Sequence, residues 1–157
     1  MNRSELYRPN VGIVVFNAQG RVWLGRRFGA DPPHNWQFPQ GGVDEGEELE
    51  AAARRELVEE TGITSVSLLG RAPEILRYDF PPKLAKSKGW RGQAQTWFAF
   101  RFEGQDAEVN LELHPPIEFD TWRWAELDEA PSLVVPFKRD SYLKIVEAFR
   151  PFARQRA

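Results

Sequence analysis

The spacing of apolar and polar positions predicts several strands. Short apolar or alternating runs that are typical of strands occupy residues 11–16, 21–27, 66–69, 74–80, 96–102 and 119–124. Residues 17–20, Asn-Ala-Gln-Gly, are turn-forming, so the first two runs are expected to form a hairpin. Residues 28–35 and 81–91 are expected to be loops, and the Gly41-Gly42 pair is expected to interrupt any regular element.

The clearest predicted helix spans residues 47–61. It is rich in Glu, Ala, Arg and Leu, which favour helix, and Leu49, Ala53 and Leu57 recur every four residues. Gly62 stands where a left-handed glycine commonly ends a helix. A second helix is expected from Pro136 to about residue 149, with proline at its first position. Together these elements predict an α/β protein, with residues 1–157 forming one domain.

Composition narrows the functional classes. Hydrophobic residues make up 41% of the 157 residues and charged residues 28%, which is typical of a globular protein. The net charge is −2, so a polyanionic ligand would have to be held by a local cluster or by metal ions. The absence of cysteine excludes disulfides and thiolate zinc sites, and the two histidines support no catalytic role. Charges at the start of the chain and the lack of a long apolar run predict a cytoplasmic protein with no membrane partner.

Three carboxylates are the strongest chemical signal. Glu56, Glu59 and Glu60 have the i, i+3, i+4 spacing that places them on one helix face, where like charges oppose helix formation unless something neutralises them. Magnesium and manganese prefer oxygen ligands and would do so. Gly41 lets backbone approach a metal or phosphate closely, and Arg55 has a position from which it can pair with a loop carboxylate. Alone, such a helix end is more typical of a solvated, salt-bridged surface.

The complete spacing changes this interpretation. From Gly41 to Ile63 the chain resembles the Nudix box, G-x5-E-x7-R-E-U-x-E-E-x-G-U with U a bulky aliphatic residue, at every specified position. The resemblance implies a Nudix fold, a mixed sheet in an α/β/α sandwich. It also implies that Glu56, Glu59, Glu60 and the carbonyl of Gly41 bind divalent cations. Arg55 would orient a carboxylate such as Glu47, and the box leaves the general base unassigned.

Segments outside the box resemble the bacterial RNA pyrophosphohydrolase subfamily, which also includes diadenosine polyphosphate hydrolases. They are residues 7–13, 26–28, 36–42, 92–98, 118–124 and 137–142. The resemblance implies that Glu118 completes the metal site. It further implies phosphate contacts for one group of residues, Arg8, Tyr78, Gln93 and Lys138. Arg27 and Phe137 would grip a nucleotide base. Taken singly, Arg27 is more typical of a surface charge, Phe137 of a core residue and Glu118 of an exposed loop glutamate.

The expected activity is hydrolysis of phosphoanhydride bonds with Mg²⁺ or another divalent cation such as Mn²⁺. The first interpretation is removal of pyrophosphate, or of phosphate stepwise, from the 5′ end of tri- or diphosphorylated RNA, leaving a 5′ monophosphate. Asymmetric hydrolysis of dinucleoside polyphosphates is the alternative. A free-nucleotide hydrolase and a catalytically silent nucleotide- or RNA-binding domain are more remote. Four basic residues, Lys83, Lys86, Lys88 and Arg91, are expected to form a loop that attracts RNA or is merely solvated. Most tryptophans are expected in the core, and no obligate protein partner is expected.

Overall fold

A mixed β-sheet forms the centre of the molecule. The computed structural model describes residues 6–154. Within them the sheet has the strand order β3-β2-β1-β7-β5, with β4 paired to β1, β6 to β7 and β8 to β2. The strands are β1 (Tyr7–Phe16), β2 (Val22–Arg27), β3 (Trp36–Gln37), β4 (Gln40–Gly42), β5 (Val66–Arg71), β6 (Leu76–Asp79), β7 (Gly92–Phe102) and β8 (Phe119–Ala125). The helices are α1 (Leu49–Thr61), α2 (Pro82–Lys88), α3 (Ala130–Leu133) and α4 (Arg139–Arg154).

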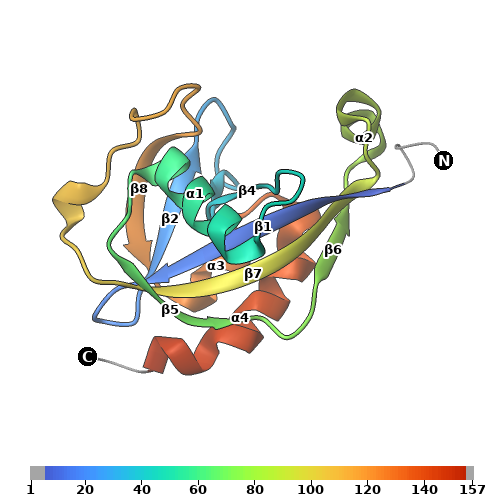
Figure 1. Cartoon of the computed structure of the whole chain (residues 1–157). Helices are drawn as coiled ribbons and strands as arrows, with labels where there is room; N and C mark the ends of the chain where they lie inside the picture. Colours follow the sequence, from blue (N-terminus) through green and yellow to red (C-terminus); the bar gives the residue numbers. More distant parts are fainter. Residues whose placement is uncertain (1–5, 155–157) are drawn as a thin grey trace.

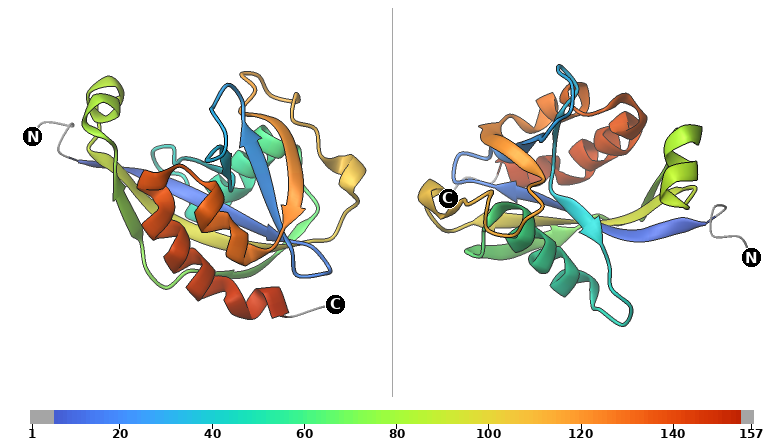
Figure 2. Two further views of the ribbon diagram at one scale, coloured as in Figure 1. Left: turned by 180° about the vertical axis from the view of Figure 1, so that it is seen from behind. Right: turned by 90° about the horizontal axis from the view of Figure 1, so that it is seen from above.

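Helices cover both faces of this sheet, as Figure 2 shows, with α1 on one side and α3 and α4 on the other. The alternation of side chains along β1 explains the two layers. Val11, Ile13 and Val15 pack in one core cluster with α1, whereas Val14 and Phe16 pack in the other with α4. The α/β/α sandwich expected from the sequence is confirmed.

The sequence of each long helix explains its position. Helix α4 buries Tyr142, Ile145, Val146 and Phe149, which recur at the three- and four-residue spacing of one helix face. Helix α1 begins two residues later than predicted, because the side chain of Glu48 caps it by accepting a bond from the Ala51 N–H at 2.8 Å. It ends as predicted at Gly62, which has φ of 78°.

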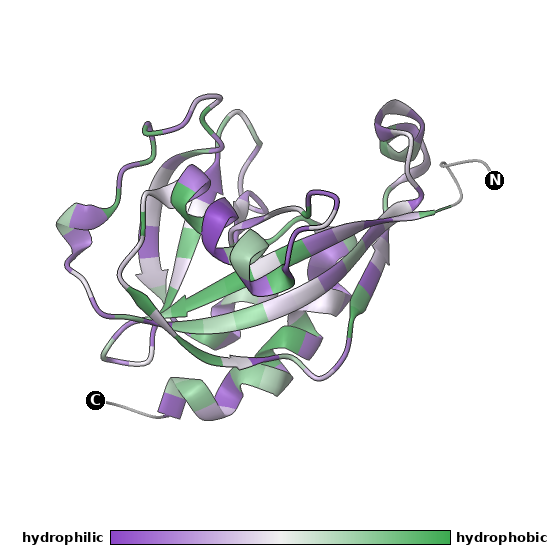
Figure 3. Ribbon diagram, viewed as in Figure 1, coloured by the Kyte–Doolittle hydropathy of each residue, from purple (hydrophilic) through white to green (hydrophobic). Residues whose placement is uncertain are grey.

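The long strand β1 runs parallel to β7 over its whole length, from Tyr7 beside Gly92 to Phe16 beside Arg101. Figure 1 shows the two strands side by side across the molecule, and α2 stands beyond their end near the N-terminus. Figure 3 shows that the opposite half of β1 is more hydrophobic than this end. The polar ends of two distant strands therefore lie together.

Three local expectations need correction. Gly41 and Gly42 do not interrupt regular structure, because strand β4 pairs with Val11 and Asn10 of β1. Residues 81–91 are not all loop: α2 forms within them, starting at a proline and ending at Gly89 with φ of 74°. The predicted hairpin of β1 and β2 is short: the two strands pair only at Phe16 and Val22, and the rest of β2 pairs with β8 and β3.

No helix among the described residues is both long and apolar enough to cross a membrane. The final predicted helix is divided into a 3₁₀ turn, Pro136–Lys138, and α4. Trp23 and Trp97 are fully buried, as expected, whereas Trp36, Trp122 and Trp124 pack at the edges of the core.

Candidate active site

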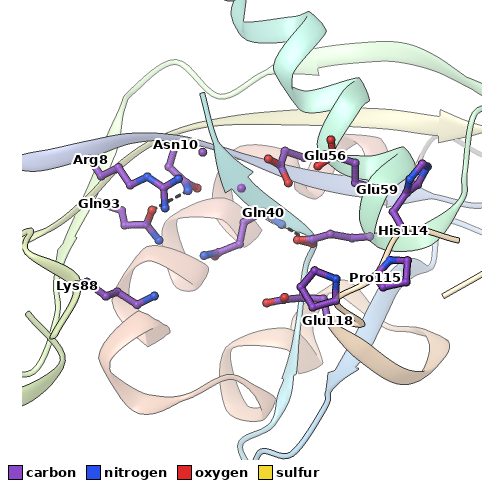
Figure 4. Close-up of a pocket in the computed structure, with 14 residues that line it drawn as sticks. Arg8, Asn10, Gln40, Glu56, Glu59, Lys88, Gln93, His114, Pro115 and Glu118 are labelled. Atoms are coloured by element: carbon purple, nitrogen blue, oxygen red, sulfur yellow. Dashed lines mark hydrogen bonds between the residues drawn. The ribbon is translucent and has the colours of Figure 1, made fainter. Parts of the chain in front are cut away.

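A pocket of about 560 Å³ lies between α1, β4 and the polar end of β1 and β7. Figure 4 shows carboxylates on one side and the side chains of Arg8, Gln93 and Lys88 on the other. The residues that line it are Arg8, Asn10, Gln40, Gly41, Gly42, Glu56, Glu59, Glu60, Lys88, Gln93, His114, Pro115, Pro116 and Glu118. We call the side formed by Gly41, Glu56, Glu59, Glu60 and Glu118 the carboxylate wall, and the side formed by Arg8, Asn10, Lys88 and Gln93 the polar wall.

Helix α1 presents three glutamates to the carboxylate wall. The adjoining part of the same helix surface packs on the sheet through Ala52, Ala53 and Leu57. Within the wall, the Glu56 side chain is 14% exposed and that of Glu59 is 44% exposed. The predicted placement of the three carboxylates on one helix face is therefore seen in the structure, with graded burial that the spacing alone did not indicate.

Arg55 holds the start of this wall together. Its guanidinium donates to both carboxylate oxygens of Glu47 at 2.7 and 2.8 Å, and to Glu56 at 2.9 Å. It also donates to the carbonyl of Gly42 at 2.9 Å. The predicted pairing of Arg55 with Glu47 is confirmed. Because Arg55 does not line the pocket, it is a positioning residue that ties the glycine strand to the helix.

Burial and mutual repulsion make negative charge on the carboxylate wall unfavourable. Burial, followed by the nearby charges of Glu118 and Glu56, raises the pKa of Glu60 well above its usual value. Burial also raises the pKa of Glu56, although the bond from Arg55 opposes this shift. Glu118 reaches the wall from the end of the 103–118 segment, where its carbonyl accepts a bond from the Phe28 N–H at 2.9 Å. The wall is thus electrostatically suited to a cation.

The two glycines of β4 leave space for side chains on opposite walls. A Cβ on Gly41 would collide with the Glu56 carboxylate, and one on Gly42 would collide with the Arg8 guanidinium. Glycine at these two positions thus leaves room for the ends of these side chains, which would have to shift to accept a Cβ. Neither glycine has the positive φ that would require glycine for backbone reasons.

A divalent cation fits the carboxylate wall by its donor chemistry. The donors are carboxylate and carbonyl oxygens, which hard cations prefer, and the close approach of Gly41 brings its strand against Glu56. Across residues 6–154, no three His, Asp or Glu side chains are already gathered at metal-binding distances from one another. The carboxylates share one pocket, with Glu56 turned to Arg55.

Strand register builds the polar wall from distant parts of the chain. The parallel pairing of β1 and β7 sets Arg8 beside Gln93, and the pairing of β6 and β7 sets Tyr78 beside Gln93. Asn10 donates to Gln93 at 2.6 Å, and Gln93 donates to the Tyr78 hydroxyl at 2.7 Å. A neighbouring amide, Gln95, donates to Asn10 at 2.9 Å. This network holds the amides in fixed orientations.

Tyr78 and Lys138 lie behind the polar wall and not on its surface. The Tyr78 hydroxyl accepts from Gln93, so its own hydrogen is available to donate. Lys138 is buried and donates to Gln37 at 3.1 Å. Burial and the positive charge of Arg27 lower the pKa of the Lys138 ammonium to about 7. Contact of either side chain with a phosphate stays a prediction.

The proposed base-binding residues lie outside the lining of this pocket. Phe137 is half-buried, and its ring centroid is 5.7 Å from that of Tyr78 and 6.4 Å from that of Phe80. Arg27 ends β2, where its partner on β8 is Phe119, the residue after Glu118. The structure thus brings Arg27 next to the carboxylate wall and Phe137 into an aromatic cluster.

The expected basic loop divides into different environments. Lys88 lines the pocket, whereas Lys83 and Lys86 are exposed on α2. Arg91 pairs with Asp79 at 3.2 Å and stacks on the Tyr7 ring at 5.2 Å. These four residues therefore do not act as one cluster.

Sequence reasoning missed several lining residues. Asn10 and Gln40 belong to segments that carried the resemblance, and the position of Asn10 directly before the apolar run of residues 11–16 was an available signal. His114 reaches the pocket from the irregular 103–118 segment, for which no periodicity existed to indicate it.

Comparisons with known proteins agree with this geometry. The NUDIX domain family matches residues 6–145, and the chain belongs to this family. It is 61% identical over 152 residues to an RNA pyrophosphohydrolase of Caulobacter vibrioides, covering 94% of this chain and 88% of that protein. It is 48% identical to an RNA pyrophosphohydrolase of Acidiphilium cryptum, covering 94% and 93%.

Two solved structures show the same fold. A C. elegans Ap4A hydrolase binary complex has a TM-score of 0.66 at 24% identity, covering 92% of this chain and 98% of that one. The E. coli dihydroneopterin triphosphate pyrophosphohydrolase has a TM-score of 0.67 at 22% identity, covering 91% and 99%. The predicted family, fold and enzyme class, a Nudix pyrophosphohydrolase, are confirmed.

Proposed function

We propose that this enzyme removes pyrophosphate from the 5′ end of triphosphorylated RNA, and acts on diphosphorylated ends as well. The observation that carries the proposal is one pocket with a carboxylate wall facing a wall of cations and amides. A phosphate chain needs cations on its oxygens, and this pocket supplies Arg8 and Lys88 on one side and carboxylates for a metal on the other. The names of the two bacterial relatives agree with RNA as the substrate.

The carboxylate wall would hold Mg²⁺ or Mn²⁺ through Glu56, Glu59, Glu60, Glu118 and the Gly41 carbonyl. Bound there, a divalent cation neutralises phosphate charge and makes a water more acidic. The chain's own residues position the reaction. Arg55 keeps Glu56 and the glycine strand in place, and its bonds to Glu47 at 2.7 and 2.8 Å fix its own orientation.

The polar wall would bind the rest of the phosphate chain. Arg8 and Lys88 supply positive charge, while Asn10 and Gln93 are oriented by bonds to each other. In the reaction, water adds to the α-phosphorus and the bond to the β-phosphate oxygen breaks, leaving RNA with a 5′ monophosphate and releasing pyrophosphate. The incoming water loses one proton, and the departing pyrophosphate carries the electron pair of the broken bond.

RNA recognition requires contacts beyond the first nucleotide, because the reacting phosphates are alike in every nucleoside triphosphate. Arg27 and Phe137 would hold a base, and one stacked base is worth about 1–3 kcal/mol, or about 5- to 150-fold in affinity. Phe137→Ala should lower kcat/KM for triphosphorylated RNA by this factor and leave free GTP nearly unchanged. If the ratio of kcat/KM for RNA to kcat/KM for GTP is the same in the variant and the wild type, Phe137 only packs against Tyr78 and Phe80.

The test of the function compares three substrates with wild-type protein and magnesium: 5′-triphosphate RNA, diadenosine tetraphosphate and free nucleoside triphosphates. We expect kcat/KM to be highest for the RNA, with a 5′-monophosphate RNA and pyrophosphate as products. A preference for free nucleotides over RNA would contradict the proposal. Activity that survives exhaustive chelation would contradict the metal requirement.

A further inference from the structure

Another pocket, of about 290 Å³, lies beside the segment that carries Glu118. Pro116 and Glu118 line the active-site pocket, whereas Ile117 and Phe119 line this one. Side chains of one short segment therefore line the two spaces in alternation. We call the second space the side groove; the lining residues that matter for its chemistry are Phe28, Asn110, Leu111, Glu112, Ile117 and Asp120.

Exposed apolar side chains form part of the side groove. Phe28 is 64% exposed, and Ile117 is 37% exposed. The Phe28 N–H donates to the carbonyl of Glu118 at 2.9 Å, so the backbone that carries the ring is fixed to the edge of the active site. An exposed apolar surface beside a binding site indicates contact with a ligand.

The polar lining of the side groove is acidic. Glu112 and Asp120 supply carboxylates and Asn110 an amide, and among the described residues that line the groove none is Lys or Arg. Arg26 donates to Oδ1 of Asp120 at 2.7 Å, which balances the charge of this carboxylate and occupies one of its two oxygens. A phosphate would be repelled by Glu112, so the groove suits a neutral group that donates hydrogen bonds.

A nucleobase has both properties. Its flat ring can stack on Phe28, as bases of single strands do on exposed aromatic side chains. Its exocyclic amino group can donate to Glu112, the kind of pairing by which carboxylates recognise the amino group of cytosine. Adenine, cytosine and guanine carry such an amino group, and uracil does not.

The side groove also continues the base-binding region of the proposed function. Arg27, the residue before Phe28, is close enough to Lys138 to lower the pKa of its ammonium, so the Arg27 side chain lies toward the polar wall. Phe28 lies instead on the side of Leu111 and Ile117. An RNA strand with one base at Arg27 would reach the groove by crossing one residue of backbone.

We propose that the side groove binds the nucleobase that follows the one held by Arg27 and Phe137, with Phe28 stacking on its ring. Glu112 accepts a hydrogen bond from the amino group of this base, which makes uracil the least favoured base there. The proposal rests on the proposed RNA function and deepens it, because it adds a contact that a free nucleotide cannot make.

The test uses short 5′-triphosphate RNAs in which one position at a time lacks its base. In the wild type, kcat/KM should fall by about 5- to 150-fold at each of two adjacent positions, the value of one stacked base. Phe28→Ala should remove the dependence on the downstream position of this pair and keep the dependence on the upstream one. Phe28→Tyr, which keeps a ring, should retain both, and Phe137→Ala should remove only the upstream dependence.

Two controls separate base binding from general damage. Free GTP has no following base, so its kcat/KM should stay within about twofold in Phe28→Ala, with thermal midpoints measured alongside to verify folding. Leu143→Ala is the matched surface control, since Leu143 is 53% exposed on α4 and lines neither space. It should leave kcat/KM for every RNA unchanged.

The amino-group contact has its own measurement. With cytosine at the downstream position, kcat/KM should exceed that with uracil by about 2- to 10-fold, the value of one hydrogen bond. Glu112→Ala should remove this preference and leave the stacking dependence on Phe28 in place.

Three outcomes would overturn the proposal. Phe28→Ala could leave the abasic profile unchanged, or it could slow RNA and GTP equally. A wild type that hydrolyses free triphosphates better than RNA would contradict the RNA function and this proposal with it. A preference for RNA that does not depend on Phe28 would contradict the side groove alone.

Discussion

The two walls of the active-site pocket differ in their electrostatics: one gathers carboxylates that repel one another, and the other gathers polar groups that bond to one another. In the carboxylate wall, burial is the main cause of the raised pKa values of Glu56 and Glu60, and neighbouring carboxylates add to it. Arg55 and, more weakly, Arg8 oppose the shift at Glu56. In the polar wall, Asn10 donates a short hydrogen bond to Gln93, which in turn donates to Tyr78 behind the wall. The carboxylate wall needs a bound cation to balance its negative charge, whereas hydrogen bonds hold the polar wall in place without a ligand.

The two walls therefore have different roles in binding the metal and the substrate. A wall with excess negative charge repels a polyphosphate until a metal is bound, and a wall of fixed donors and cations attracts one at any time. Changes in the carboxylate wall should therefore act on metal binding and kcat. Changes in the polar wall should act on substrate affinity.

Neutralising one carboxylate should give the largest effect. We expect Glu56→Gln or Glu60→Gln to lower kcat by about 100-fold or more, the scale of a lost acid–base or metal-binding group. The metal-free thermal midpoint should stay equal or rise, because repulsion in the wall decreases. Magnesium should stabilise the wild type by linkage and these variants much less.

The matched control is Glu50→Gln on the same helix. Glu50 pairs with Arg54 at 3.1 Å and does not line the pocket, so kcat should be unchanged. A marked fall of the metal-free midpoint in Glu60→Gln would contradict the repulsion argument.

The adjacent glycines offer a direct comparison of the two walls. Gly41→Ala places a methyl group against Glu56 and should weaken metal affinity by about 10- to 100-fold, as changes that displace a ligand commonly do. Gly42→Ala meets the flexible end of Arg8 and should raise KM by at most about tenfold, or about 1.4 kcal/mol, with little change in kcat. Magnesium titrations measure the first effect and steady-state kinetics the second. A higher KM in Gly41→Ala together with weaker metal affinity in Gly42→Ala would contradict the separate roles of the two walls.

The Arg55–Glu47 pair should govern acid stability. The bonds from Arg55, followed by the bond from the Asp44 N–H, lower the pKa of Glu47 to about 2 from its usual 4.5. Since the folded pKa is depressed, this contribution to stability is present above pH 4.5 and is lost as the pH falls toward 2. In the wild type, the free energy of unfolding measured by denaturant titration should fall as the pH is lowered over this range. In Arg55→Met this fall should be smaller. The same substitution should also lower kcat, since Glu56 loses its partner.

The basic residues around α2 should give the smallest effect. Lys88→Ser should raise KM for every polyphosphate substrate, because Lys88 lines the pocket. The double change Lys83→Ser, Lys86→Ser should flatten only the salt dependence of KM for long RNA, by a log–log slope of about 1.4 for two single-strand contacts. If the double change affects RNA and a dinucleoside polyphosphate equally, α2 interacts only with the phosphate chain. If it affects neither substrate, the lysines of α2 are solvated surface residues.

Much of the carboxylate wall was predictable because its residues are local. Glu56, Glu59 and Glu60 share one helix turn and a half, and helical periodicity alone places them together. Arg55 and Glu47 are eight residues apart, and the resemblance to the Nudix box related them. The burial of Glu60 was not predictable, since it depends on β4 packing beside α1, and Gly41 and Gly42 were expected to interrupt regular structure.

The family, the hydrolase class, the layered α/β fold and the carboxylates of α1 could be predicted from the sequence, because they depend on periodicity and on one motif of 23 residues, 41–63. The family resemblance had indicated Arg8 and Gln93 as phosphate contacts, but it was the tertiary structure that brought them together in the polar wall. Arg8 and Gln93 are separated by most of the chain and meet only through the parallel register of β1 and β7. It also placed Tyr78 and Lys138 behind the wall and brought Phe28 together with Leu111 and Ile117 in the side groove. Strand register is set by packing on both faces of the sheet, which no local stretch of sequence contains.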